Sequence, residues 1–128
     1  MSSRSPQAMV LAAVALAATT PTGAAAHHSF AMFDRTRQVS LAGVVKSFQW
    51  TNPHSWVQLA VRKGSADEEW AIEALSPNVL GRQGWKRNTL KAGDKVTVVI
   101  NPLRDGKLGG NLVSITLADG RTLGGGAE

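Results

Sequence analysis

The sequence predicts an all-β fold with one short helix, and three observations support that prediction. After residue 38, several segments alternate between apolar and polar residues with the two-residue period of a half-buried strand. Glycine, proline, asparagine and aspartate separate these segments at short intervals, which is typical of small barrels and sandwiches. A single Ser76-Pro77 step opens a helical segment. With 128 residues, the chain has room for one domain.

Three strands are expected before the helix, at residues 39–50, 54–62 and 69–75. Gly43, in the middle of the first strand, predicts a bend or a bulge there. Asn52-Pro53 marks the turn into the second strand, because proline cannot donate to a ladder. In the third strand, Trp70 and Ile72 are expected to face the core.

The helix is expected from Ser76 to Gln83, with Gly84 as its left-handed stop. Two further strands follow, at residues 95–101 and 111–117, and a short stretch at residues 121–123 comes last. Three strands, a helix and two strands (β-β-β-α-β-β) is the order of the OB-fold, a small five-stranded Greek-key barrel. We therefore predict an OB-like barrel, with a plain β-sandwich as the rival architecture.

The first 26 residues have the layout of a secretory signal peptide. Arg4 supplies a positive start, residues 8–18 form an apolar run, and Ala24-Ala25-Ala26 fits the small-residue cleavage rule. The run is shorter than the ~20 apolar residues that span a bilayer. Cleavage would make His27 the first residue, or Ala26 if it falls one position earlier. The alternative is a retained N-terminal anchor helix.

We accordingly expect a periplasmic protein that is exported by the general secretory route and does not span the membrane once processed. The expected organisation is a signal peptide (1–26), an N-terminal arm (27–37), a barrel (38–123) and a flexible tail (124–128). The net charge of +5 is mild and its basic residues look scattered, so no nucleic-acid partner is expected. Zero cysteines exclude disulfides, thiolate metal sites and cysteine nucleophiles.

Nine segments of the mature chain carry a family resemblance. They are His27-His28-Ser29-Phe30, Phe33-Asp34, Gly43-Val44-Val45, Trp50-Thr51-Asn52-Pro53-His54, Trp70-Ala71-Ile72-Glu73, Ser76-Pro77-Asn78, Gly84-Trp85, Leu90-Lys91-Ala92-Gly93-Asp94 and Asp119-Gly120-Arg121. With these segments the chain resembles a family of small exported bacterial proteins catalogued as domain of unknown function 6152. The resemblance implies an exported small β-barrel and implies no activity.

The three histidines, His27, His28 and His54, are the candidate metal ligands. If His27 is the first residue, its α-amine and ring bind one ion together, and His28 or His54 adds a third nitrogen. If Ala26 is first, the amine, two deprotonated amides and the His28 imidazole form a square-planar set. Both arrangements suit Cu(II) or Ni(II), which favour tetragonal nitrogen sites. The competing interpretation is that the histidines are structural or incidental.

A second candidate site surrounds the Asn-Pro-His turn. Trp50 and Trp56 flank it and, with Asn52, form a platform that suits a peptide, a glycan or an envelope protein of unknown identity. The alternative is that both tryptophans pack in the core or at its rim. Glu69 and Glu73 share a strand face, and we expect that face to be solvated rather than to do acid–base work.

Enzyme motifs are missing from the sequence. It contains no G-x-S-x-G elbow, no H-E-x-x-H helix and no phosphate loop. We therefore expect a non-enzymatic binding protein that takes copper or nickel at its mature N-terminus. The alternatives are an interaction module that uses the tryptophan-flanked turn, and a structural subunit of an envelope complex.

Overall fold

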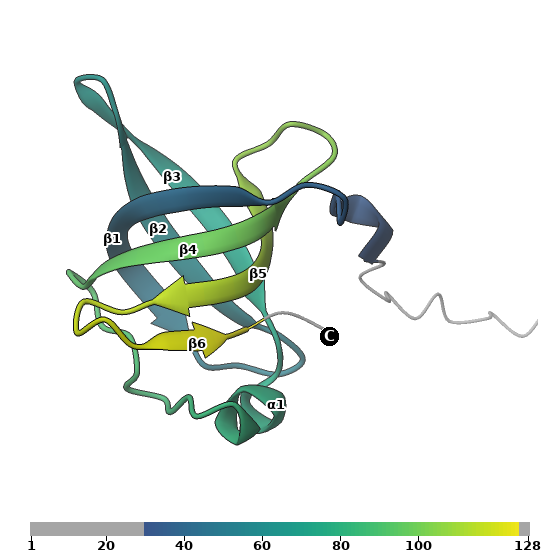
Figure 1. Ribbon diagram of the computed structural model, residues 1–128, viewed down its shortest axis with the longest axis vertical. Helices are drawn as coiled ribbons and strands as arrows, with labels where there is room; N and C mark the ends of the chain where they lie inside the picture. Colours follow the sequence, from purple (N-terminus) through teal and green to yellow (C-terminus); the bar gives the residue numbers. More distant parts are fainter. Residues whose placement is uncertain (1–29, 126–128) are drawn as a thin grey trace, which may run out of the picture.

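The computed structural model describes residues 30–125 (Figure 1). In chain order the elements are η1 (Phe30–Met32), β1 (Val39–Gln49), β2 (Ser55–Lys63), β3 (Ala66–Ala74), α1 (Pro77–Arg82), β4 (Lys95–Pro102), β5 (Gly109–Thr116) and β6 (Thr122–Gly124). The predicted order of three strands, a helix and two strands is therefore confirmed. The stretch expected at residues 121–123 is the short strand β6.

The five main strands close into a barrel. β1 pairs with β2 and with β4, β2 pairs with β3, and β4 pairs with β5, all antiparallel. A short parallel pairing between β3 and β5 joins the two ends of the sheet. The long β1 belongs to both halves, because Val39–Val44 pair with β4 and Val44–Gln49 pair with β2. The closed barrel, rather than the rival sandwich, is the observed architecture.

The bulge of β1 does not lie at Gly43, where a bend or a bulge was predicted. The β1–β2 register shifts between Val45 and Ser47, after the glycine. Gly43 itself is required by a close approach, because a Cβ at this position would lie 2.5 Å from the carbonyl oxygen of Ala60. The glycine therefore lets β1 and β2 come close together.

The helix lies between β3 and β4, where it was predicted. Pro77 stands in its first turn, Gln83 is the C-cap, and Gly84 follows with a φ of 94° in the left-handed region. The side chain of Ser76 makes no capping hydrogen bond, in contrast to what its position suggested. Within residues 30–125 there is no helix whose length and apolar character would suffice to traverse a bilayer.

The core is formed by alternating apolar residues of the strands together with apolar residues of α1 and of the segments that follow α1 and β5. Its buried members are Val45, Val57, Leu59, Ile72, Ala74, Leu80, Trp85, Leu90, Val96, Val98, Ile100, Leu112, Ile115 and Leu117. Trp70 packs against this core, as its inward position predicted. Trp85 is buried just after α1, and its Nε1–H donates to the Gly124 carbonyl at 2.7 Å. The indole thereby ties the end of the helix to β6.

The ordered part of the barrel extends past residue 123. β6 ends at Gly124, and the Gly125 carbonyl accepts the Leu75 N–H at 3.3 Å. The Gly125 N–H in turn donates to Val113 of β5 at 3.2 Å. Gly124 and Gly125, which were expected to belong to a flexible tail, are therefore hydrogen-bonded to the barrel, and the rest of that expected tail lies outside the described residues.

Candidate functional site

The described part of the N-terminal arm is docked on the barrel. Phe33 is buried and forms an antiparallel bridge with Leu103, in the loop between β4 and β5. The Arg104 N–H donates to the Met32 carbonyl at 2.9 Å. Figure 1 shows η1 beside this loop. These contacts fix the position from which the preceding residues of the chain extend.

His54 is held by a buried carboxylate. It precedes β2, after a cis Asn52-Pro53 bond, and its Nδ1 lies 2.6 Å from Oε1 of Glu73. The side chain of Glu73 is only 6% exposed, whereas that of His54 is 27% exposed. An ionised carboxylate only accepts hydrogen bonds, so opposite an ionised Glu73 the proton of this contact belongs to Nδ1.

The prediction that Glu73 lies on a solvated face is wrong. Strand alternation does turn the side chain of Glu73 away from the barrel core. Its cross-strand neighbours, however, are Trp56 on β2 and Asn111 on β5. Asn111 in turn pairs with Asn101 on β4, and both asparagines are buried. The parallel β3–β5 pairing therefore encloses Glu73 between strands. Glu69, near the other end of β3, is exposed and pairs with Lys46 at 2.9 Å.

Oε2 of Glu73 is buried and has no hydrogen-bond partner within residues 30–125. Buried polar groups are usually hydrogen-bonded, so an unpaired acceptor at this position favours a donor or a cation nearby. The site thus combines an oriented imidazole with a carboxyl group that is shielded from water.

Two of the predicted metal ligands, His27 and His28, lie outside the described residues, as does the whole predicted signal peptide. Among residues 30–125, no three histidine, cysteine, aspartate or glutamate side chains are grouped as a metal site requires.

The tryptophan-flanked turn is shaped by packing. Trp50 packs against the core and meets the ring of Phe48 edge-on, with centroids 5.8 Å apart. Asn52 is exposed, and the half-buried Trp56 lies beside Glu73 in the β2–β3 register. The three residues predicted to form one platform thus occupy three different environments.

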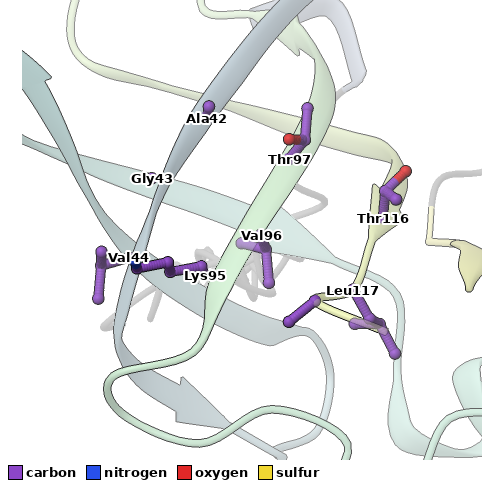
Figure 2. Close-up of a pocket in the computed structure, with 9 residues that line it drawn as sticks. Ala42, Gly43, Val44, Lys95, Val96, Thr97, Thr116 and Leu117 are labelled. Atoms are coloured by element: carbon purple, nitrogen blue, oxygen red, sulfur yellow. The ribbon is translucent and has the colours of Figure 1, made fainter. Parts of the chain in front are cut away.

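A separate shallow groove crosses the outside of β1, β4 and the end of β5, with a volume of about 430 Å³ (Figure 2). Its lining residues are Ala42, Gly43, Val44, Lys95, Val96, Thr97, Thr116, Leu117 and Ala118. Lys95 is the one charged residue of this lining, and none of the predicted site residues belongs to it. The groove therefore shares no residue with the His54–Glu73 pair.

Residues 13–112 match the sequence profile described as Family of unknown function (DUF6152). The chain belongs to this family. The match spans most of the chain, including the arm, His54 and Glu73, and the DUF6152 description assigns no activity. No curated protein and no solved structure is significantly similar to this DUF6152 chain.

The residue that sequence reasoning missed in this DUF6152 protein is Glu73 as the partner of His54. One signal was present, because Glu73 ends one of the segments that carry the family resemblance. The alternation of the strand predicted the opposite, because a residue on the outward face of a strand is expected to be solvated.

Proposed function

We propose that this DUF6152 protein is an exported, non-enzymatic binding protein of the periplasm that takes up Cu(II), with Ni(II) as the alternative ion. Its ligands are His54 and the histidines of the mature N-terminus, His27 and His28. The observation that supports the proposal is the 2.6 Å contact between His54 Nδ1 and Glu73.

Metal-binding histidines usually donate their second ring N–H to a carboxylate or a carbonyl, which fixes the tautomer and raises the basicity of the ligating nitrogen. With the proton on Nδ1, the lone pair of a neutral His54 lies on Nε2, the atom that binds a metal. The buried Glu73 charge also favours a cation next to the imidazole. Imidazole nitrogens suit both copper and nickel.

We infer that the mature N-terminus reaches this imidazole from the docked arm. Phe33 bridges to Leu103, whose N–H bonds to Gly109, and Gly109 pairs with Ala71. Three ladder steps and two residues of β3 thus separate Phe33 from Glu73, roughly 16 Å in all. Because Phe30–Met32 form the 3-10 helix η1, which rises about 2 Å per residue, the segment from His27 to Phe33 spans up to about 16 Å, which just matches this separation.

The two cleavage outcomes make different demands on His54. A chain that begins at His27 offers its amine and its ring, so it needs a further nitrogen, and His54 supplies it. A chain that begins at Ala26 completes a square-planar set with His28 and needs nothing from the barrel. The proposal is the first of these arrangements, because it gives the His54–Glu73 pair a role.

The test starts with the intact mass of the exported protein, followed by Cu(II) titration of the same sample under electron paramagnetic resonance. Wild type is compared with a His27→Ala, His28→Ala double variant and with His54→Ala. We expect one nitrogen-rich site in wild type and weaker binding in both variants.

Undiminished binding in the double variant would overturn copper binding by the N-terminus. Loss in the double variant but not in His54→Ala would replace the proposed site with the Ala26 chelate. Since the chain has three histidines, the double variant retains His54 as its one imidazole. It therefore also measures how strongly that residue binds copper alone.

A further inference from the structure

The connection between α1 and β4 concentrates positive charge. It carries Lys86, Arg87 and Lys91, and Arg82 at the end of α1 and Lys95 at the start of β4 bring the number of basic residues to five, all of them exposed. Its one carboxylate, Asp94, accepts the backbone N–H of Lys91 at 2.9 Å. The segment from residue 82 to residue 95 therefore holds five cations against one anion, although the basic residues of the whole chain look scattered in sequence.

These five cations differ from the paired cations of the barrel. Elsewhere within residues 30–125, ion pairs join Lys46 to Glu69, Arg62 to Asp67, Lys63 to Glu68, Lys107 to Asp105, and Arg121 to Asp119. Within that same range, none of the five cations of the connection takes part in an ion pair. Their charge is therefore not neutralised by a neighbouring carboxylate.

The backbone of the connection is anchored to the barrel core, which fixes the positions from which its basic side chains extend. Trp85 and Leu90 are buried in the core. The Gly93 N–H donates to the Val45 carbonyl, and the Val45 N–H donates to the Asp94 carbonyl, both at 2.8 Å. Figure 1 shows α1 and the connection running along one end of the barrel. Lysine and arginine side chains thus project outward from a rigid edge.

We propose that this edge, the basic edge (residues 82–95), binds the anionic headgroups of a phospholipid bilayer. An anionic bilayer surface attracts clustered lysine and arginine without any apolar anchor. A protein partner, in contrast, is usually held by buried aromatic or aliphatic residues at the centre of the contact. The large apolar side chains of the connection, Trp85 and Leu90, are buried and offer no such anchor. On the expected export route the chain meets headgroups and not nucleic acid.

The expected effect of each cation is measurable. A basic residue near an anionic membrane changes the partition coefficient by about five-fold. Removal of three of them should weaken vesicle binding by about a hundred-fold, and added salt should weaken wild-type binding because the contact is electrostatic.

The test uses the protein purified after export and vesicles of phosphatidylcholine, either alone or with one third phosphatidylglycerol, in a co-sedimentation assay. The test variant is Arg82→Gln, Lys86→Gln, Arg87→Gln. The matched control is Arg62→Gln, Lys63→Gln, Lys107→Gln, which removes the same net charge from ion-paired positions. Urea unfolding of all three proteins verifies that they are folded.

We expect binding to the anionic vesicles alone, a large loss in the test variant and a small loss in the control. Equal losses in the two variants would show that net charge, rather than the basic edge, drives binding and would overturn the proposal. Equal binding to both kinds of vesicle would overturn it too, because the contact would then be apolar. Tighter binding to a DNA duplex than to the anionic vesicles would assign the basic edge to a different polyanion.

Discussion

The imidazole of His54 and the carboxylate of Glu73 join the start of β2 to the end of β3, with 2.6 Å between Nδ1 and Oε1. The two residues are far apart in the sequence, and the adjacent register pair Ser55–Ala74 brings them together. A carboxylate that is 6% exposed cannot be replaced without consequence for the imidazole that it orients. This relationship decides what His54 can do.

The first prediction concerns copper affinity. In the proposed site, the carboxylate of Glu73 orients His54 and makes its imidazole more basic. Glu73→Gln removes this carboxylate, and loss of such a partner typically costs 10–100-fold in metal affinity. We expect a loss of about that size in the Cu(II) titration. Glu69→Gln is the matched control, because Glu69 is on the same strand but exposed and paired with Lys46. Equal affinities of the two variants would contradict a role for Glu73.

The second prediction concerns two tryptophans. Trp85→Phe leaves the Gly124 carbonyl without its 2.7 Å hydrogen bond, so we expect the free energy of unfolding to fall by about 1–3 kcal/mol. Trp70→Phe removes a buried Nε1–H that has no hydrogen-bond partner within residues 30–125, so the loss of stability should stay below about 1 kcal/mol. Urea unfolding followed by circular dichroism measures both. The reverse ranking would show that Trp85 does not tie α1 to β6.

The third prediction compares two glycines. A Cβ at Gly110 would lie 2.5 Å from the Asn101 carbonyl oxygen, so Gly110→Ala should force β4 and β5 apart and lower the melting temperature. Gly81 lies in α1 with open space around the same position, and Gly81→Ala should stabilise the protein by about 0.5–1 kcal/mol. Scanning calorimetry distinguishes the two. A stable Gly110→Ala variant would mean that the strands tolerate a wider spacing.

The fourth prediction concerns the arm at acid pH. The hydroxyl of Thr36 donates to the Asp34 carboxylate at 2.6 Å, and this hydrogen bond lowers the pKa of Asp34, with help from Arg104 and Arg37. A lowered folded-state pKa stabilises the fold above the unfolded-state pKa, and that contribution disappears as pH falls through the folded-state pKa. Thr36→Val should therefore raise the pKa of Asp34 toward its ordinary value.

Carbon-13 NMR titration of the aspartate side chains measures this shift. Asp119 is the internal reference, because its pKa is lowered by the backbone and side-chain hydrogen bonds of Arg121, which Thr36→Val leaves intact. An Asp34 titration that does not respond to Thr36→Val would show that the hydroxyl does not set its pKa.

Much of the fold follows from local patterns. Alternation placed Val57, Leu59 and Ile72 in the core, and the Ser-Pro step and Gly84 bounded the helix to within a residue. A bulge was expected at Gly43 because glycine often marks one, but glycine also occurs where two strands approach closely. The close approach of Ala60 to Gly43 is a contact between strands, which the local sequence does not reveal. The docking of Phe33 on Leu103 was likewise beyond local reasoning, because it depends on a loop seventy residues away.

By itself, the sequence determined the element order and the inward faces of the strands, because the two-residue period and the turn residues act over a few positions. It also singled out His54. The tertiary structure alone decided what surrounds that histidine: the parallel closure of β3 on β5 encloses Glu73 between Trp56 and Asn111. It likewise decided which cations remain unpaired. Burial and charge pairing depend on neighbours across the barrel, which no local pattern contains.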